Sequence, residues 1–157
     1  MGEAEATKTA TASAAAQAIE ERAPATPGQM AMGWLLGALG WAVPGLGHLL
    51  LKKFDRAVVF FFSVSAMAAL GLAMGAKIYA PSFDRSQGMF VLLLHLLGFL
   101  GDLGAGAFYF AARWAALGED YMPRALGDYG TVFFLCAGLL NLLTALDAYD
   151  IAVGKKE

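Results

Sequence analysis

The chain has 157 residues, of which 59% are hydrophobic, only 15% are charged and 19 are glycine. Soluble domains carry about 25% charged residues and about 7% glycine. So few charges cannot cover a water-exposed surface, so the composition excludes an ordinary soluble domain and indicates an integral membrane protein. The net charge of −2, without a basic tract, also argues against nucleic acid as a partner.

The first 29 residues differ from the rest of the chain. They are rich in Ala, Thr and Glu, and Pro24, Pro27 and Gly28 precede the first apolar run. A segment this polar and simple cannot bury a core, so residues 1–29 are expected to form a disordered tail. The tail is not a secretory signal, because it is acidic and does not lead directly into a short apolar segment.

Four apolar stretches follow, at residues 30–51, 57–76, 89–112 and 129–153. Together they contain only three charged side chains, Asp102, Asp147 and Asp150. Each stretch has at least 20 residues, enough for a helix to cross a hydrocarbon core of about 30 Å. The sequence therefore predicts an all-α, polytopic membrane protein with four transmembrane helices and a short polar end at residues 154–157.

The connection between the first two stretches sets the expected topology. Residues 52–56 are too few for anything but an antiparallel hairpin. An even number of spans places both termini on one side, opposite this turn. Three of the five turn residues are basic, which favours the cytoplasm for the turn and the outside for the termini.

A distinctive motif ends the first stretch and enters the turn. Its marked residues are Pro44, Gly45, Gly47, His48, Asp55 and Arg56. Pro44 removes a backbone donor and kinks a helix, and the glycines permit close approach. Over residues 30–76 this pattern resembles the prokaryotic two-transmembrane-helix domain family, although Leu49, Leu50 and Lys52 stand where that family usually has an aromatic pair and a glycine.

The C-terminal part carries a second resemblance. The run from Asp128 through Asn141 to Asp150 is similar to a small bacterial membrane-protein family known only as a domain of unknown function. Both resemblances imply an architecture and a place in the bacterial inner (cytoplasmic) membrane. Neither implies an activity.

Polar residues inside the predicted spans are candidate functional residues, because burying them in lipid is costly. Counting from the helix ends, His48 and Asp102 lie toward one face and form a possible polar cluster. His95 lies toward the other face, and Asn141 lies deeper. Asp147 and Asp150, three residues apart, lie nearer the surface.

Each polar residue also has a structural interpretation. His48 fits a capping or headgroup-level residue as well as an active one. Asp102 fits either a hydrogen-bonding partner within the bundle or a proton- or ion-handling carboxyl. Asn141 fits an interhelical hydrogen bond. Asp147 and Asp150 fit the interfacial end of the fourth helix, facing basic residues at the same membrane surface: Lys77, Arg85, Lys155 and Lys156.

Glycines recur at spacings that place them on one helix face. The candidates for close helix packing are Gly33, Gly37, Gly71, Gly75, Gly98 and Gly101. Such faces bring backbones together where no hydrophobic effect drives association. They serve either packing within the bundle or the docking of another subunit.

The remaining signals favour a protein without cofactor or metal. His48 and His95 lie near opposite membrane faces, too far apart for one haem, and Cys136 has no companion thiol. The preferred function is a non-enzymatic membrane protein that packs through its Gly-rich faces as a scaffold or accessory subunit. Its partners are the lipid bilayer and another protein or a second copy. The alternative is a proton- or ion-conducting element that uses Asp102 and His48. A lipid-modifying enzyme is disfavoured because no nucleophile and base share a depth.

Overall fold

The computed structural model describes residues 25–81, 88–117 and 125–156. These residues form six helices and no strand: α2 (Pro27–Ala42), α3 (Leu46–Leu50), α4 (Phe54–Ala73), α5 (Met89–Gly104), α6 (Ala107–Trp114) and α7 (Ala125–Ala152). The all-α expectation therefore holds for the described chain. Most of the expected tail lies outside the described residues, and α2 begins within its last three positions.

The start of α2 is fixed by a local cap. The Thr26 side chain accepts a hydrogen bond from the backbone N–H of Gln29, and the Gln29 side chain accepts one from the Thr26 N–H. This reciprocal pair satisfies two donors that a helix start leaves open. Pro27 follows at the first helical position, where a missing N–H costs nothing.

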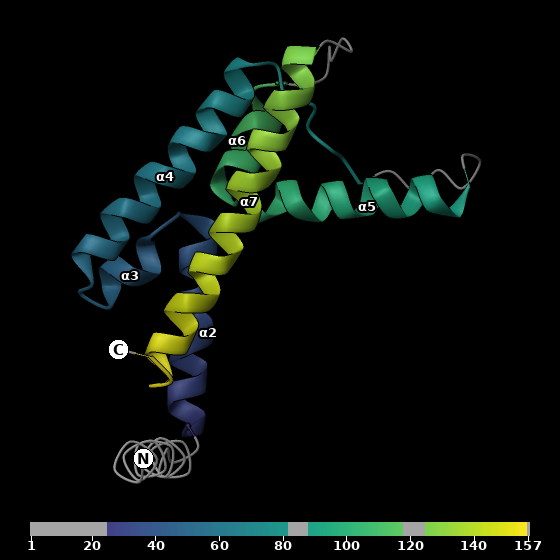
Figure 1. The fold of residues 1–157 in the computed structure, drawn as a ribbon. Coiled ribbons are helices and arrows are strands. Elements are labelled where there is room, and N and C mark those ends of the chain that lie inside the picture. The colour runs from purple at the N-terminus through teal and green to yellow at the C-terminus, as the bar shows by residue number, and fades with distance from the viewer. Residues whose placement is uncertain (1–24, 82–87, 118–124, 157) are drawn as a thin grey trace, which may run out of the picture.

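Helix α7 is the central element, and α2 and α4 both pack along it (Figure 1). A Cβ on Gly33 of α2 would lie 2.9 Å from the Tyr149 ring of α7, and one on Gly71 of α4 would lie 2.8 Å from the Gly130 carbonyl oxygen. Both helices therefore run antiparallel to α7. The small residues allow these close approaches, which maximise van der Waals contact.

The first predicted span, residues 30–51, is not one helix. Helix α2 ends at Ala42, and Gly45 takes a left-handed conformation with φ of 78°. The chain then reverses, because a Cβ on Gly47 of α3 would lie 2.7 Å from the Leu36 carbonyl oxygen of α2. Pro44 supplies no donor to continue the helix, and Gly45 tolerates the reversal without a Cβ clash.

This reversal overturns the predicted topology. Arg56, just after the turn, lies 3.9 Å from Asp147 near the end of α7, measured from Nη1 to Oδ2. Residues 52–56 therefore lie at the same end of the bundle as the C-terminal residues, not opposite them. The prediction was wrong because it read the Pro44 break as a kink within a span.

The third predicted span, residues 89–112, is also broken. Helices α5 and α6 are bent by 106° at a two-residue break, where Gly106 has φ of 59°. Helix α6 packs into the core with α4 and α7, whereas α5 leaves the bundle sideways (Figure 1). A straight helix and this bent pair share the same apolar pattern, so hydropathy did not distinguish them.

Two helices, α4 and α7, are long and apolar enough to cross a membrane, or three spans result if the bent pair α5–α6 counts as one. The prediction of four spans is therefore wrong for the described chain. The second and fourth stretches correspond to α4 and α7 with shifted ends. These apolar helices indicate a membrane location.

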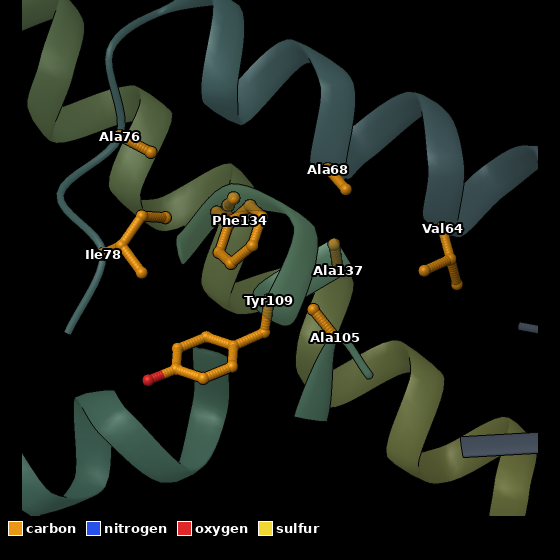
Figure 2. Close-up of a cluster of buried hydrophobic side chains, with 9 residues drawn as sticks. Val64, Ala68, Ala76, Ile78, Ala105, Tyr109, Phe134 and Ala137 are labelled. Carbon is orange, nitrogen blue, oxygen red and sulfur yellow. The ribbon is translucent and has the colours of Figure 1, made fainter. Parts of the chain in front are cut away.

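The main core lies where α4, α6 and α7 meet the segment after α4. Figure 2 shows the Phe134 ring in the middle of this cluster, among small side chains from the neighbouring elements. The cluster members are Val64, Ala68, Ala76, Ile78, Ala105, Tyr109, Ala112, Phe134 and Ala137. Five of these nine are alanine, so the helices approach closely around the rings of Phe134 and Tyr109.

Candidate functional site

The two helix breaks meet beside Asn141, in the central part of α7. The Asn141 Nδ2 donates to the carbonyl oxygens of Trp41, at 2.7 Å, and Gly104, at 2.9 Å. Trp41 lies in the last turn of α2 and Gly104 ends α5, and the last carbonyls of a helix have no partner within it. Asn141 is fully buried, so one amide group satisfies carbonyls at two interrupted helices.

Trp41 joins the same two breaks from the other direction. Its indole Nε1 donates to the Leu103 carbonyl oxygen at 3.0 Å. Its ring meets Phe110 of α6 edge-on, with centroids 6.5 Å apart. The end of α2, the end of α5 and the start of α6 are therefore held together by two side chains, and we call this region the junction (residues 41–43, 103–107 and 141).

At the junction, α2 and α6 lie end to end. A Cβ on Gly106 would overlap the Trp41 carbonyl oxygen and lie 3.0 Å from that of Ala42. Helix α2 packs along α7, and α6 contributes Tyr109 and Ala112 to the core formed with α4 and α7. The C-terminus of α2 thus faces the N-terminus of α6, an arrangement in which the helix dipoles align favourably.

An apolar pocket of about 340 Å³ opens beside this stack. It is lined by Trp41, Ala42, Val43, Gly106, Ala107 and Phe110. A second apolar pocket, of about 250 Å³, lies between the α2–α3 reversal and α4. Among the residues that the structure describes, no three His, Cys, Asp or Glu side chains come together to hold a metal ion.

Asp102 anchors the segment that follows α4. Its Oδ2 accepts a hydrogen bond from the Tyr79 backbone N–H at 2.7 Å. Tyr109 of α6 donates its hydroxyl to the Tyr79 carbonyl oxygen at 3.3 Å, and the Lys77 N–H donates to Thr131 Oγ1 of α7 at 2.9 Å. Three helices therefore hold residues 77–79 in place. Asp102 is fully buried, and its Oδ1 has no hydrogen-bond partner within the described parts of the chain.

His95 lies near Asp102 through a shared neighbour. The rings of His95 and Tyr79 meet edge-on with centroids 5.7 Å apart, and Tyr79 also covers Gly98, where a Cβ would lie 2.9 Å from the ring. The His95 Nδ1 lies 3.0 Å from the Val91 carbonyl oxygen, one turn earlier in α5. Both residues therefore contact Tyr79, Asp102 through the Tyr79 backbone and His95 through the Tyr79 ring.

His48 belongs to a different cluster, at the C-terminal end of α7. Its Nε2 lies 3.1 Å from Asp147 Oδ2, and its ring meets Phe60 of α4 with centroids 4.9 Å apart. The imidazole is 1% exposed. The structure therefore brings His48 together with Asp147, while Asp102 has Tyr79 and Asn141 has the junction. His48 and Asp102, expected to form one polar cluster, therefore lie in two separate places.

Most of the ion pairs that the described residues form at this end involve Asp147. Lys156 Nζ donates to its Oδ1 at 2.8 Å, and this bond raises the pKa of the Lys156 ammonium above its usual value. Asp150 lies 3.7 Å from Lys155 and 3.9 Å from Lys156, between nitrogen and carboxylate oxygen. These two aspartates thus pair with Arg56, Lys155 and Lys156, while Asp55 in the first turn of α4 is exposed.

The candidate packing glycines face inward, except one. A Cβ on Gly37 would lie 3.4 Å from the Ala145 carbonyl oxygen, and one on Gly101 would lie 2.7 Å from the Leu135 side chain. Gly33, Gly71 and Gly98 have the intramolecular contacts given above. Gly75 has no atom within 4 Å of such a Cβ and instead has φ of 78° just beyond the end of α4.

Sequence reasoning did not identify Trp41 or Tyr79. The signal for Trp41 was its indole N–H within an apolar run, because a buried indole usually needs an acceptor. Tyr79 donates and accepts through its backbone, so its side-chain type carries no signal for these bonds.

Residues 35–157 match the family of unknown function DUF6677. Comparison with curated proteins and with solved structures gives no match. None of these comparisons supports the resemblance of residues 30–76 to the two-transmembrane-helix domain family, which stays a prediction. The match covers the junction, the hydrogen bond between Asp102 and Tyr79, and the ion pairs of Asp147. The chain therefore belongs to the family of unknown function DUF6677.

Proposed function

We propose that this chain is an integral protein of the bacterial inner membrane, crossed by α4, by α7 and by a composite of α2 and α6. The 16 residues of α2 and the 8 of α6 rise about 36 Å when stacked, against a hydrocarbon core of about 30 Å. The junction then lies within the membrane. Irregular backbone at that depth is tolerated where protein buries it, as Asn141 and Trp41 do.

Within this membrane protein, α5 serves as the element that docks onto another membrane protein. Its last turns pack on α7 through Gly101 and Gly104, but its first turns leave the bundle at a steep angle (Figure 1). The exposed fractions are 80% for Met89 and 77% for Phe90 in the first turn, and 65% for Leu97 in the middle of the helix. This projecting apolar helix is the observation that carries the proposal.

Lipid is a poor environment for the tip of such a helix. Because α5 joins α7 opposite Gly138, in the central part of that helix, it leaves the bundle at mid-membrane depth. The start of α5 at Gly88 has no side-chain cap. Each open backbone N–H in hydrocarbon costs several kcal/mol, and a neighbouring protein that supplies acceptors removes that cost. The chain therefore acts as a non-enzymatic scaffold or accessory subunit.

The glycine-rich faces do not supply this docking surface, because they contact other parts of the same chain. What remains for a partner is the apolar side of α5. Leu93, Leu94 and Leu97 repeat at helical spacing along it and are all exposed.

Photo-cross-linking in native membranes tests the proposal. A photoreactive amino acid replaces Leu93 or Leu97 on α5, and in a matched control it replaces Phe62 on α4, which is 66% exposed. We expect protein adducts from both α5 positions and only lipid adducts from Phe62. The mass of the adduct separates a different protein from a second copy. Lipid adducts alone from α5, or equal protein adducts from Phe62, contradict the proposal.

Proton or cation conduction is the second candidate, favoured by the buried Asp102 Oδ1 that lacks a partner among the described residues. Asp102→Asn keeps the Oδ2 acceptor for the Tyr79 N–H but cannot exchange a proton. For a scaffold we expect no proton or cation flux through purified protein in liposomes. A flux in the original protein that Asp102→Asn abolishes would replace the scaffold proposal with this one.

A further inference from the structure

The α2–α3 reversal regroups the basic residues of the chain. It brings the turn beside the C-terminal residues, so Lys52, Lys53, Arg56, Lys155 and Lys156 lie at one end of the bundle, which we call the basic end. Three aspartates, Asp55, Asp147 and Asp150, lie there too. At the opposite end, the described residues contribute two basic side chains, Lys77 and Arg113.

The charges at the basic end are not equally neutralised. Asp147 and Asp150 pair with Arg56, Lys155 and Lys156, whose side chains nevertheless stay 46% to 62% exposed. Lys52 and Lys53 have no carboxylate partner within the described parts of the chain. Lys52 is exposed in a left-handed conformation with φ of 60° at the tip of the turn. At the turn, Lys52 is therefore an exposed ammonium group without a carboxylate partner among the described residues, and Lys53 beside it is half-buried.

An apolar side chain accompanies these ammonium groups. Phe54, directly after Lys53, is 59% exposed at the first turn of α4. Lysines beside an exposed aromatic ring match a membrane surface, where phosphate groups meet the ammonium charges and the ring enters the headgroup region. A soluble anion offers no counterpart for Phe54.

We propose that the basic end faces the cytoplasm and binds the anionic phospholipid headgroups of that leaflet through Lys52 and Lys53. The inference goes beyond the docking role of α5 and rests only on the membrane location proposed above. It keeps the expected cytoplasmic side for the turn, and it moves the start of α2 and the C-terminal residues, expected outside, to the same side. Basic residues accumulate on the cytoplasmic side of membrane proteins, and this end holds most of those in the described chain.

Lipid titration of the purified full chain tests the binding. Native mass spectrometry compares phosphatidylglycerol with phosphatidylcholine for the original protein, for Lys52→Gln/Lys53→Gln, and for the opposite-end control Lys77→Gln/Arg113→Gln. We expect the first variant to lose about 25-fold in phosphatidylglycerol affinity, about fivefold for each lysine. The control should keep its affinity, and the melting temperature of each variant reports whether it is folded.

Thiol labelling tests the orientation independently. In a Cys136→Ala background, Asp55→Cys probes the basic end and Ala115→Cys the opposite end. We expect a membrane-impermeant maleimide to label Asp55→Cys only in inside-out vesicles and Ala115→Cys only in right-side-out vesicles. The reverse labelling, an unchanged phosphatidylglycerol affinity in Lys52→Gln/Lys53→Gln, or an equal loss in the control would overturn the proposal. None of these results bears on cross-linking from α5.

Discussion

Single polar side chains carry much of the organisation of this small bundle. Asn141 satisfies one carbonyl at the end of α2 and one at the end of α5, and both lie at breaks that expose backbone. Thr144, one turn later, is also buried, but its hydroxyl donates only within the same helix, to the Asn141 carbonyl oxygen at 2.8 Å and to Asn141 Oδ1 at 3.5 Å. Asn141 therefore links separate helices, whereas Thr144 does not.

Replacing Asn141 tests this difference. Asn141→Leu leaves the Trp41 and Gly104 carbonyls without their side-chain donor and should lower the free energy of unfolding by roughly 2 to 4 kcal/mol. Thr144→Val removes a hydroxyl whose bonds stay within its own helix, one of them long, and should cost under about 1 kcal/mol. Melting temperatures in detergent measure both. Equal losses would show that Asn141 does not hold the junction.

The sequence predicted the role of a single polar residue better than it predicted which residues contact each other. A lone Asn in an apolar run indicates an interhelical hydrogen bond, and Asn141 makes two. His48 and Asp102 were grouped by counting depth along straight helices. Because α3 runs in the direction opposite to α2, His48 lies beside Asp147, which is 99 residues away in the sequence. Depth counting cannot detect a reversal that depends on contacts with α4 and α7.

At the scale of elements, the apolar segments were predictable, and Pro44 indicated a kink in the first, but neither the reversal there nor the bend at Gly106 was predicted. The runs that became α4 and α7 are continuous apolar stretches with no proline, and they form long helices. The other two runs are equally apolar, but Gly45 and Gly106 adopt positive φ there. Glycine permits that conformation without requiring it. Whether the chain bends is decided by what packs against the glycine, such as the Trp41 carbonyl beside Gly106.

Gly106→Ala tests the bent pair directly. An alanine there is strained by the positive φ, and its Cβ overlaps the end of α2, so we expect a loss of at least about 2 kcal/mol of unfolding free energy. Gly28→Ala is the matched control, because a Cβ there meets nothing within 4 Å. That variant should be unchanged or up to about 1 kcal/mol more stable. A harmless Gly106→Ala would contradict the α2–α6 stack.

At the scale of the whole molecule, the reversal places the turn and the C-terminal residues together. Paired cysteines in a Cys136→Ala background test this arrangement. Arg56→Cys with Asp147→Cys should be joined rapidly by a short bifunctional thiol reagent, since the original side chains approach to 3.9 Å. Arg56→Cys with Ala115→Cys should not be joined, because Ala115 follows α6 at the other end. Preferential linking of the second pair would restore a straight first span.

The end-to-end stack of α2 and α6 also has a consequence for how the protein is made. The chain emerges from the ribosome in order, so α2 is synthesised long before α6. The Trp41 carbonyl has no side-chain donor until Asn141, 100 residues later, has been synthesised. In the proposed membrane arrangement, the α2–α3 hairpin has until then no continuation across the bilayer, so its insertion is not complete before α6 and α7 follow. A nascent chain stopped after α6 should remain sensitive to proteases, and the first stable product should be one that includes Asn141.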